Sequence, residues 1–262
     1  MKIAGKVVVV TGGADGIGAA LCHRFHEEGA AFIAVADRNE DRARDVARTV
    51  GGAAYALDVA DRAAIEALVH EVEARHGRID LFCSNAGVGD ADPDPAWAVS
   101  APDETWNRLW HINVMAHVYA ARAVLPGMVA RGGGYLLQTI SAAGLLSQVG
   151  GTVYSATKHA AVGLAESIAI AHGGQGVGVS ILCPQGVDTA MLRNSRQGAD
   201  RPDGVLTPRE VADSVIEGLE DERFLILPHP QVAGYMQRKA ADYDRWLGGM
   251  RKLRARMLSR NP

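Results

Sequence analysis

A tyrosine and a lysine four residues apart form the most informative pair of side chains in this sequence. Tyr154 and Lys158 fall in a stretch predicted to be helical, from Val153 to His172. Residues at i and i+4 of a helix share a face about 6 Å apart, and an ammonium group at that distance favours the phenolate form of tyrosine. A phenolate can accept a proton. The pair alone is weak evidence, because this spacing also occurs by chance on helix surfaces.

Composition limits the classes of protein to which the chain can belong. It has 262 residues, 48% of them hydrophobic, which is enough for one substantial core and predicts a single domain over 1–262. A formal net charge of -3 gives no electrostatic footprint for nucleic acid, and no run approaches the ~18 apolar residues of a membrane span. Because Met1 to Lys6 leads directly into a strand with no room for a signal peptide, a cytoplasmic location is expected.

The cysteines indicate neither a disulfide nor a metal site. Cys22, Cys83 and Cys183 are odd in number, far apart, and lack the Cys-x-x-Cys spacing of zinc ligands. His229, between two prolines, has no partners at ligand spacing. We expect buried, reduced thiols and no metal.

Apolar runs alternate with helical patterns along most of the chain. The predicted strands are Lys6 to Thr11, Phe32 to Ala36, Ala53 to Leu57, Leu81 to Ser84, Tyr135 to Ile140, Val177 to Cys183 and Phe224 to Leu227. The predicted helices are Gly16 to Glu28, Glu40 to Val50, Arg62 to His76, Asp103 to Arg131 with a break near Pro126, Val153 to His172, and Pro208 to Leu219. This alternation predicts an α/β fold with a doubly wound parallel sheet of about seven strands, flanked by helices on both faces, with sites beyond the carboxyl ends of the strands.

The first strand end carries a glycine-rich turn. Its sequence, Thr11-Gly12-Gly13-Ala14-Asp15-Gly16-Ile17-Gly18, allows a tight turn and close approach of the backbone to a ligand. The helix that follows offers free N–H groups and a positive dipole end to a pyrophosphate. Because the spacing differs from the common Gly-x-Gly-x-x-Gly fingerprint, an ordinary strand-to-helix turn is the alternative.

The second strand end favours the dinucleotide interpretation. Asp37 follows the turn by about 20 residues, where a carboxylate accepts a hydrogen bond from an adenosine ribose hydroxyl. A carboxylate there repels the 2′-phosphate of NADP, and Asp15 adds negative charge at the same end. The sequence therefore predicts NAD in preference to NADP, with Arg38 as the residue that argues the other way.

Taken together, these and further motifs resemble the short-chain dehydrogenase/reductase family. They are Thr11-Gly-x-x-x-Gly-Ile-Gly18, Asp58-Val59, Asn85-Ala86-Gly87, Asn113, Ser141 and Tyr154-x-x-x-Lys158, in this order. The similarity runs from about Gly5 to Leu227, and the joint pattern is far more specific than any one piece. The resemblance implies a Rossmann fold and a nicotinamide-dependent oxidoreductase.

The resemblance also implies a role for each catalytic position. Tyr154 would be the general acid/base, and Lys158 would lower its pKa and hold the nicotinamide ribose. Ser141 would hydrogen-bond the reacting oxygen, although a serine there could also be a turn or cap residue. Asn113 would hold a water that links Lys158 to solvent; outside this motif set, a mid-helix asparagine is usually solvated.

The remaining cofactor assignments follow from the same motifs. Asp58 and Val59 would contact the adenine, although Asp58 could also be the N-cap of the next helix. The expected cofactor-binding residues are Gly12, Asp15, Gly16, Ile17, Gly18, Asp37, Arg38, Asp58, Val59, Asn85, Ala86, Gly87, Tyr154, Lys158, Pro184, Val187 and Thr189. One segment departs from the family pattern Pro-Gly-x-Val-x-Thr: Gln185 stands where glycine is usual, and we expect its side chain to face solvent.

Three loops at strand ends are expected to enclose the substrate: Val88 to Ala101, Ala142 to Gly151 and Met191 to Val205. The candidate substrate residues within them are Leu145, Gln148, Met191 and Leu192, with Trp97 nearby. Their apolar character, with no Arg or Lys cluster, favours a neutral, hydrophobic secondary alcohol or its ketone. The alternative is that these side chains pack the loops themselves.

Beyond the resemblance, about residues 230–258 form a basic amphipathic pattern, Val232 to Leu258. Because Asp242 and Asp244 mix with the basic residues, packing over the substrate cleft or on a sister subunit is favoured over a membrane. In the family the helices of 103–131 and 153–172 pair subunits, so a homotetramer, or a dimer, is expected.

Three functions stay open at this point. The first is an NAD-dependent secondary-alcohol dehydrogenase, and the second is a ketone reductase using NADPH or NADH with the same residues. The third is a non-catalytic nucleotide-binding regulatory protein, which would be expected to have lost Tyr154 and Lys158.

Overall fold

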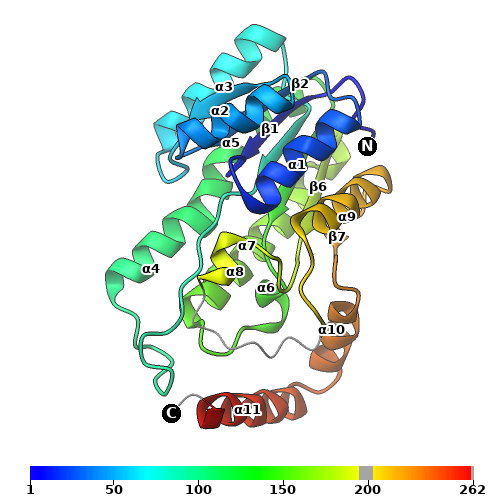
Figure 1. Cartoon of the computed structure of the whole chain (residues 1–262). Coiled ribbons are helices and arrows are strands. Elements are labelled where there is room, and N and C mark those ends of the chain that lie inside the picture. The colour runs from blue at the N-terminus through cyan, green and yellow to red at the C-terminus, as the bar shows by residue number, and fades with distance from the viewer. Residues whose placement is uncertain (195–202, 261–262) are drawn as a thin grey trace.

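The computed structural model describes residues 1–194 and 203–260, which contain one parallel sheet in the order β3-β2-β1-β4-β5-β6-β7 (Figure 1). The strands are β1 (Val7–Thr11), β2 (Phe32–Asp37), β3 (Ala53–Ala56), β4 (Leu81–Ser84), β5 (Gly134–Thr139), β6 (Val177–Leu182) and β7 (Leu225–Ile226). Each predicted strand segment forms a strand. The predicted doubly wound parallel sheet of seven strands is confirmed.

Helices connect the strands and cover both faces of the sheet. They are α1 (Gly16–Glu27), α2 (Glu40–Thr49), α3 (Arg62–His76), α4 (Asp103–Trp110), α5 (Ala116–Ala130), α6 (Ala143–Leu146), α7 (Thr152–His172), α8 (Ala190–Arg193), α9 (Pro208–Glu220), α10 (Gln231–Ala241) and α11 (Tyr243–Arg260). A π-helical turn (His111–Met115) joins α4 to α5, and a 3-10 turn (Gly173–Gln175) follows α7.

Alternating side chains of the strands build two separate apolar cores. In β1, Val8 and Val10 pack with α1, α2 and α9 on one face, whereas Val7 and Val9 pack with α3, α5 and α7 on the other. A strand covered on both faces needs apolar residues at every position, which explains the continuous valine run. The strand order reverses beside β1, and the crevice at such a reversal is where nucleotides bind in this class of fold.

The long helical segment at 103–131 is interrupted at a different place from the predicted one. Pro126 lies inside α5, and the irregularity is the π-helical turn His111–Met115, where the N–H of Ala116 bonds to the carbonyl of His111. A turn of this kind inserts one extra residue into a helix and is frequent at functional sites. Asn113 lies in the middle of it.

The segment from Asp103 to Ala130 is also long and apolar enough, by length and composition alone, to cross a membrane. In the structure, its residues Ala116, Ala120 and Val124 are buried in the core against the sheet. Packing against the sheet accounts for this apolar face.

The C-terminal tail forms two helices rather than one. Asp242 separates α10 from α11 with an extended backbone, and its carboxylate accepts a hydrogen bond from the N–H of Arg245 at 2.9 Å. An aspartate in this position stops one helix and caps the next, so the continuous pattern of 232–258 bends there.

Candidate active site

Two hydroxyl groups predicted to be catalytic meet at the carboxyl edge of the sheet. Ser141 follows β5, and Tyr154 lies in the first turn of α7. The Ser141 Oγ accepts a bond from the N–H of Ala143 at 3.1 Å, and the Ser141 side chain lies close enough to the Tyr154 phenol to oppose the rise of its pKa. The bond to Ala143 fixes the serine rotamer, so the serine and tyrosine hydroxyls can share one reacting oxygen.

Lys158 lies one helical turn further along α7, with only 3% of its surface exposed. Its Nζ donates to the carbonyl of Thr139 at 3.3 Å and lies 5.6 Å from the centre of the Tyr154 ring. A Cβ placed at Gly87 would come within 3.4 Å of both this Nζ and the Asn113 Oδ1. Gly87 therefore leaves room between the lysine and the asparagine.

Burial shifts the pKa of both Tyr154 and Lys158, and the expected lowering of the Tyr154 pKa by Lys158 stays a prediction. Burial raises the pKa of Tyr154, and the Ser141 hydrogen bond opposes this rise only in part. Burial also lowers the pKa of Lys158 to about 8. Burial is the largest cause of both shifts, and the Lys158 Nζ donates to the Thr139 carbonyl. Burial therefore favours the neutral form of the Tyr154 phenol.

Asn113 is fully buried and bridges three segments. Its Oδ1 accepts from the N–H of Val88 at 3.0 Å, and its Nδ2 donates to the carbonyl of Val88 at 2.9 Å and to Thr157 Oγ1 at 3.3 Å. The side chain thereby holds the loop after β4 against α7. Its role in binding a relay water stays a prediction.

The glycine turn has a backbone that side chains would block. Gly12 and Gly16 have φ angles of 66° and 53°, in the left-handed region that favours glycine. A Cβ at Gly18 would lie 2.0 Å from the carbonyl oxygen of Gly12, so only glycine fits. Asp15 is the N-cap of α1 and accepts from the N–H of Gly16 at 2.7 Å. Among the N–H groups of the first turn, the Asp15 carboxylate bonds only that of Gly16. The remaining N–H groups of the first turn, including that of Ile17, can bond an anionic ligand.

Asp37 lies at the end of β2 beside this turn. Its Oδ2 accepts from the N–H of Ala14 at 3.1 Å, and its Oδ1 accepts from Asn39 at 2.8 Å. Arg38 is exposed. The structure adds a cation that the sequence analysis missed: Arg42 Nη1 lies 3.1 Å from Asp15 Oδ2 across the turn.

Thr11 and Asn85 tie the ends of β1 and β4 together. The Thr11 Oγ1 accepts from the N–H groups of Asn85 and Ala86, and the Asn85 amide donates to the carbonyls of Thr11 and Gly12. The segment Asn85 to Gly87 therefore braces the turn from the side opposite Asp37.

The structure corrects one alternative role of Asp58. The N-cap of α3 is Asp61, whose Oδ1 accepts from Ala63 and Ala64, whereas Asp58 accepts from the N–H of Ala60. Asp58 is exposed and Val59 is buried. The exposed carboxylate is thus free of the capping role and stays available as a predicted adenine contact.

The segment after β6 reaches the glycine turn through Thr189. A Cβ at Gly16 would touch Thr189 Cγ2 at 3.0 Å, and Thr189 is the N-cap of α8. Val187 is buried and pairs with Leu206 in an isolated parallel bridge. Pro184 is buried as well, and its carbonyl accepts from Ser141 Oγ at 3.5 Å.

Gln185 is partly buried rather than fully exposed, and its backbone N–H donates to His229 Nδ1 at 3.2 Å. His229 has 1% of its surface exposed, and burial lowers its pKa. A neutral imidazole from the start of the tail therefore supports the loop that departs from the family pattern.

The predicted substrate residues occupy different environments. Gly89 lies between Met191 and Tyr154: a Cβ there would be 3.5 Å from the Met191 sulfur and 3.8 Å from Tyr154 Cδ2. Met191 is 46% exposed, and Leu192 follows it in α8. Leu145 instead packs against both the main core and the tail, so the loop-packing alternative holds for it.

The other loop residues are less decisive. The backbone N–H of Gln148 donates to Ser155 Oγ at 2.8 Å, and Trp97 is 63% exposed. Part of the predicted segment Met191 to Val205 lies outside the described residues.

Sequence reasoning missed Asp92, which anchors the substrate loop to the catalytic helix. Its Oδ1 accepts from the N–H of Thr152 at 3.0 Å, and its Oδ2 accepts from the Thr152 hydroxyl at 2.9 Å. The N–H of Asp92 donates to the carbonyl of Gly150. A carboxylate at the N-terminus of α7 fits the helix dipole and fixes the turn that carries Tyr154. No local motif marks this role.

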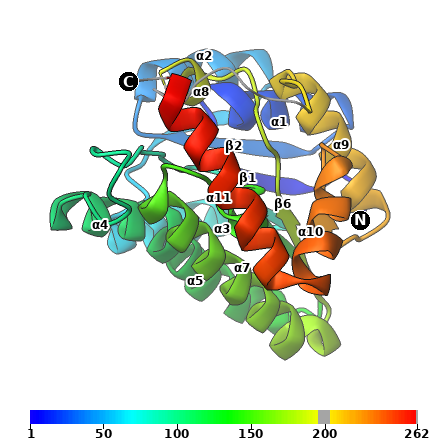
Figure 2. The ribbon, with the colours of Figure 1, turned by 90° about the horizontal axis from the view of Figure 1, so that it is seen from below.

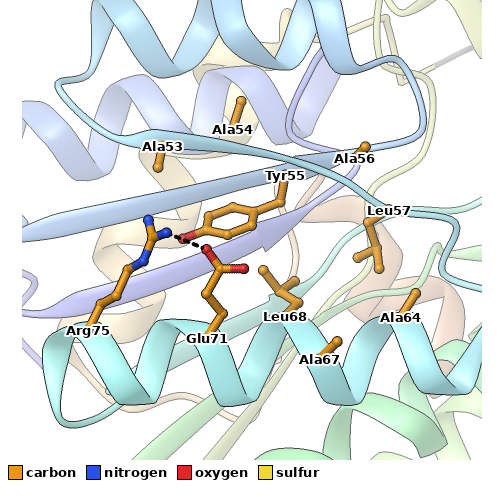
Figure 3. Close-up of a pocket in the computed structure, with 10 residues that line it drawn as sticks. All are labelled: Ala53, Ala54, Tyr55, Ala56, Leu57, Ala64, Ala67, Leu68, Glu71 and Arg75. Atoms are coloured by element: carbon orange, nitrogen blue, oxygen red, sulfur yellow. Dashed lines mark ion pairs between the residues drawn. The ribbon is translucent and has the colours of Figure 1, made fainter.

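A hollow of about 530 Å³ lies elsewhere, between the edge strand β3 and α3 (Figure 3). Several alanines line this hollow, and their small side chains leave the space unfilled. An ion pair of 2.9 Å between Glu71 and Arg75 lies beside the Tyr55 ring. No predicted catalytic residue lines it. Among residues 1–194 and 203–260, no group of three His, Cys, Asp or Glu side chains is placed to hold a metal ion, and the three cysteines are buried and free.

Comparison with known proteins identifies the family. A family model described as short chain dehydrogenase matches residues 6–200. The chain belongs to the short chain dehydrogenase family. It is 35% identical over 237 residues to 1-deoxy-11-beta-hydroxypentalenate dehydrogenase from Streptomyces exfoliatus, covering 86% of this chain and 84% of that one. It is 34% identical over 194 residues to meso-2,3-butanediol dehydrogenase from Serratia marcescens, covering 73% and 75%.

A solved structure shares the fold of this short chain dehydrogenase closely. The short chain dehydrogenase/reductase from Burkholderia phymatum, in complex with NAD, superposes with a TM-score of 0.83 at 27% identity, covering 93% of this chain and 96% of that one. Family membership and the named relatives show that the chain is an oxidoreductase acting on CH–OH groups of alcohols.

The residues of the glycine turn fit a nicotinamide dinucleotide. The space that only glycine leaves at Gly18, the N-terminus of α1 and the Asp37 carboxylate lie at the reversal of strand order. Gly12, Gly16 and Gly18 would admit the pyrophosphate, and Asp37 would hold the adenosine ribose.

Proposed function

We propose that this short chain dehydrogenase interconverts a neutral, hydrophobic secondary alcohol and its ketone, with NAD as the preferred cofactor. The observation that carries the proposal is the convergence of Ser141 and Tyr154 beside the buried Lys158, at the same sheet edge as the glycine turn. NAD, when bound, accepts the hydride from the alcohol carbon, and its oxidised ring carries a positive charge.

Tyr154 handles the proton in the proposed reaction. In oxidation, its phenolate oxygen takes the proton of the alcohol hydroxyl; in reduction, the phenol gives that proton to the carbonyl oxygen. Ser141 donates a hydrogen bond to the same substrate oxygen and keeps it in line with the phenol. Lys158 supplies the positive charge that favours phenolate, and Asn113 holds the Val88 loop that packs beside it.

The preference for NAD rests on charge at the ribose end. Asp37 and Asp15 place two carboxylates beside the turn, and a 2′-phosphate would bring further negative charge to them. Arg42 neutralises Asp15 in part, through a contact between two exposed side chains that solvent screens. Asp37 therefore dominates the selection.

A second candidate, reduction of the ketone as the main direction, is favoured by one observation. Burial raises the pKa of Tyr154, so the phenol keeps its proton at neutral pH and is ready to donate it. The oxidative rate should accordingly rise as pH increases, because only the phenolate accepts the substrate proton. A non-catalytic regulatory role is disfavoured because Ser141, Tyr154 and Lys158 converge.

Two properties of the whole protein stay proposals. A homotetramer or dimer through α4, α5 and α7 is supported by the exposed apolar residues Trp110, 42% exposed, and Ile170, 85% exposed. A cytoplasmic location agrees with the three free, buried cysteines. Light scattering on the purified chain tests the assembly.

The decisive experiment is a panel of secondary alcohols and ketones followed by the absorbance of the reduced nicotinamide. NAD and NADP are tested in parallel for oxidation, and NADH and NADPH for reduction. We expect turnover with NAD and cyclic or apolar secondary alcohols. No turnover with any alcohol or ketone, together with no NAD binding by calorimetry, would refute the proposal.

A further inference from the structure

The last helix of the chain has one face turned toward the body of the protein. In α11 the partly buried side chains include Trp246, Met250, Leu253 and Met257, spaced as one stripe of a helix. Arg251, Lys252 and Arg256 are exposed. Among the described residues, only Trp246 of this stripe belongs to an apolar cluster of the protein.

One end of the tail is fixed to the segment that follows Ser141. Lys239 of α10 donates to the carbonyl of Leu145 at 2.7 Å. Trp246 packs in a cluster with Leu146 of α6 and Val232 of α10. The first turn of α11 is therefore anchored beside the wall of the site that α6 forms.

The other end of the tail is fixed to the opposite loop. The Arg254 guanidinium donates to the carbonyls of Pro95 and Ala96 at 2.7 and 2.8 Å. The same loop is tied to the first turn of α7 by Asp92 and Thr152. Arg254 thus links α11 to the loop that positions the helix of Tyr154.

These anchors make α11 span the carboxyl edge of the sheet. Figure 1 shows α11 below α6, α7 and α8, and Figure 2, seen from below, shows it crossing in front of the strands. Trp246 and Arg254 are eight residues apart, which corresponds to about 12 Å of helix. A helix held at both points lies across the side on which Tyr154 and Met191 meet Gly89.

The charge distribution on the tail indicates which class of ligand the inner face of α11 can contact. Lys239 and Arg254, the cations turned toward the body, are bonded to neutral carbonyl groups. The cations of the outer face, such as Arg251 and Arg256, are exposed. Leu253 and Met257 are partly buried on the same stripe as Trp246, so the face of α11 turned toward the body is apolar, and Lys239 and Arg254 are both engaged by carbonyl groups.

We propose that α11 is the third wall of the substrate site and that Arg254 determines specificity for bulky, apolar alicyclic secondary alcohols. The proposal rests on the proposed alcohol dehydrogenase function. Arg254 holds the apolar stripe of α11 at a set distance from the site. A bulky alcohol reaches this stripe, whereas a small alcohol bound at Ser141 and Tyr154 does not.

The test compares Arg254→Ala with Arg256→Ala, which removes an exposed arginine of the same helix and serves as the matched control. The substrates are a decalin-type secondary alcohol and 2-butanol, both with saturating NAD. For Arg254→Ala we expect the KM of the bulky alcohol to rise about tenfold with kcat nearly unchanged, a loss of uniform binding. The values for 2-butanol should stay within about twofold, as should both substrates with Arg256→Ala.

A second variant addresses the apolar stripe without disturbing the anchor. Leu253→Trp adds bulk to the inner face and should lower kcat/KM for the bulky alcohol while 2-butanol is oxidised as before. Thermal unfolding of each variant checks that the fold is retained. The inference is overturned if the kinetic constants of both alcohols change equally. It is also overturned if the constants of the bulky alcohol change in neither Arg254→Ala nor Leu253→Trp. Absence of turnover with any alcohol in the unaltered protein contradicts the proposed function instead.

Discussion

The nucleotide end and the substrate end of this site are built in different ways. At the nucleotide end the turn itself is formed by nearby residues: Gly18 faces Gly12, and Ala14 bonds to Asp37, 23 residues away, although Asn85 and Thr189 also reach it from distant segments. At the substrate end the contacts join distant parts of the chain: Lys239 bonds to Leu145 over 94 residues, and Arg254 to Pro95 over 159. Local sequence can specify the glycine turn, whereas the enclosure of the substrate end exists only after folding.

The glycine turn meets the requirements of a cofactor that the family shares, whereas the loops and the tail meet those of an individual substrate. The glycine turn admits little change, because a side chain at Gly18 would overlap the backbone of Gly12. The tail is held by a few hydrogen bonds to backbone carbonyls, which place few demands on the identity of the residue that supplies the carbonyl. Such contacts can vary between relatives that share the family fold. Four variants test this division.

The largest effect is expected at the residue between the two ends. Tyr154→Phe removes the proton-transferring hydroxyl and keeps the ring, so kcat should fall by about 10²- to 10⁴-fold. NAD affinity, measured by calorimetry, should change far less than kcat, because the glycine turn and Asp37 are intact and only one expected contact, the Tyr154 hydroxyl, is removed. Tyr243→Phe, on the exposed start of α11, is the control. An equal loss of NAD binding in Tyr154→Phe would contradict the separation of the two ends.

The buried ammonium of Lys158 should lower the folding stability of the protein. Its pKa falls from the ordinary 10.5 to about 8, so Lys158→Met should gain about 3 kcal/mol of unfolding free energy at neutral pH. The unfolded chain binds more protons than the folded one between these pKa values. Stability of the unaltered protein should therefore rise with pH from about 8 to 10.5, and this rise should be missing in the variant.

Denaturant unfolding at several pH values measures this prediction, with the exposed Lys252→Met as the control. Activity of Lys158→Met should be lost while stability increases. A variant that retains the pH slope of the unaltered protein would show that another group titrates there.

Gly18→Ala tests the rigidity of the nucleotide end. The added Cβ would lie 2.0 Å from the Gly12 oxygen and force the turn open, so the Kd for NAD should rise at least about tenfold. Gly163→Ala is a matched control in α7, since a Cβ there meets nothing within 4 Å. Calorimetry with NAD distinguishes them. Similar affinities in the two variants would mean that the turn adapts and is not as constrained as its geometry indicates.

The smallest effect is expected at Asp92. Asp92→Asn replaces a charged acceptor by an amide, whose NH2 can only donate to the Thr152 hydroxyl, so the turn of α7 that carries Tyr154 should loosen and kcat should fall about 3- to 10-fold. NAD affinity should stay the same. Asp94→Asn, in the same loop, is the control because asparagine can make its turn bond to Ala96. A fall in thermal stability with no change in kcat would assign Asp92 a purely structural role.

Most of the fold could be predicted from the sequence, and the exceptions have physical causes. Strands buried on both faces and amphipathic helices leave periodic patterns, so all seven strands and the helices from α1 to α9 that exceed two turns were foreseen. The short helices α6 and α8 have four residues each, too few for a periodic pattern. The π-helical turn at 111–115 contains neither proline nor glycine, so no helix-breaking residue marks it in the sequence.

The candidate site divides in the same way. The motifs predicted which residues meet at the sheet edge, and Ser141, Tyr154, Lys158 and Asn113 do lie there. The motifs did not indicate how strongly burial shifts the pKa values of Tyr154 and Lys158, because burial depends on the tertiary structure. Leu145 was assigned to the substrate, but it packs against the core and the tail.

The sequence by itself determined the sheet, the glycine turn and the class of chemistry. These depend on residues whose backbone conformation or period can be recognised within one segment, such as Gly12 to Gly18. Only the tertiary structure decided how the site is enclosed. Asp92, His229 and Arg254 act on backbone groups far away in the chain, and a hydrogen bond to a carbonyl leaves no pattern in the sequence that supplies it.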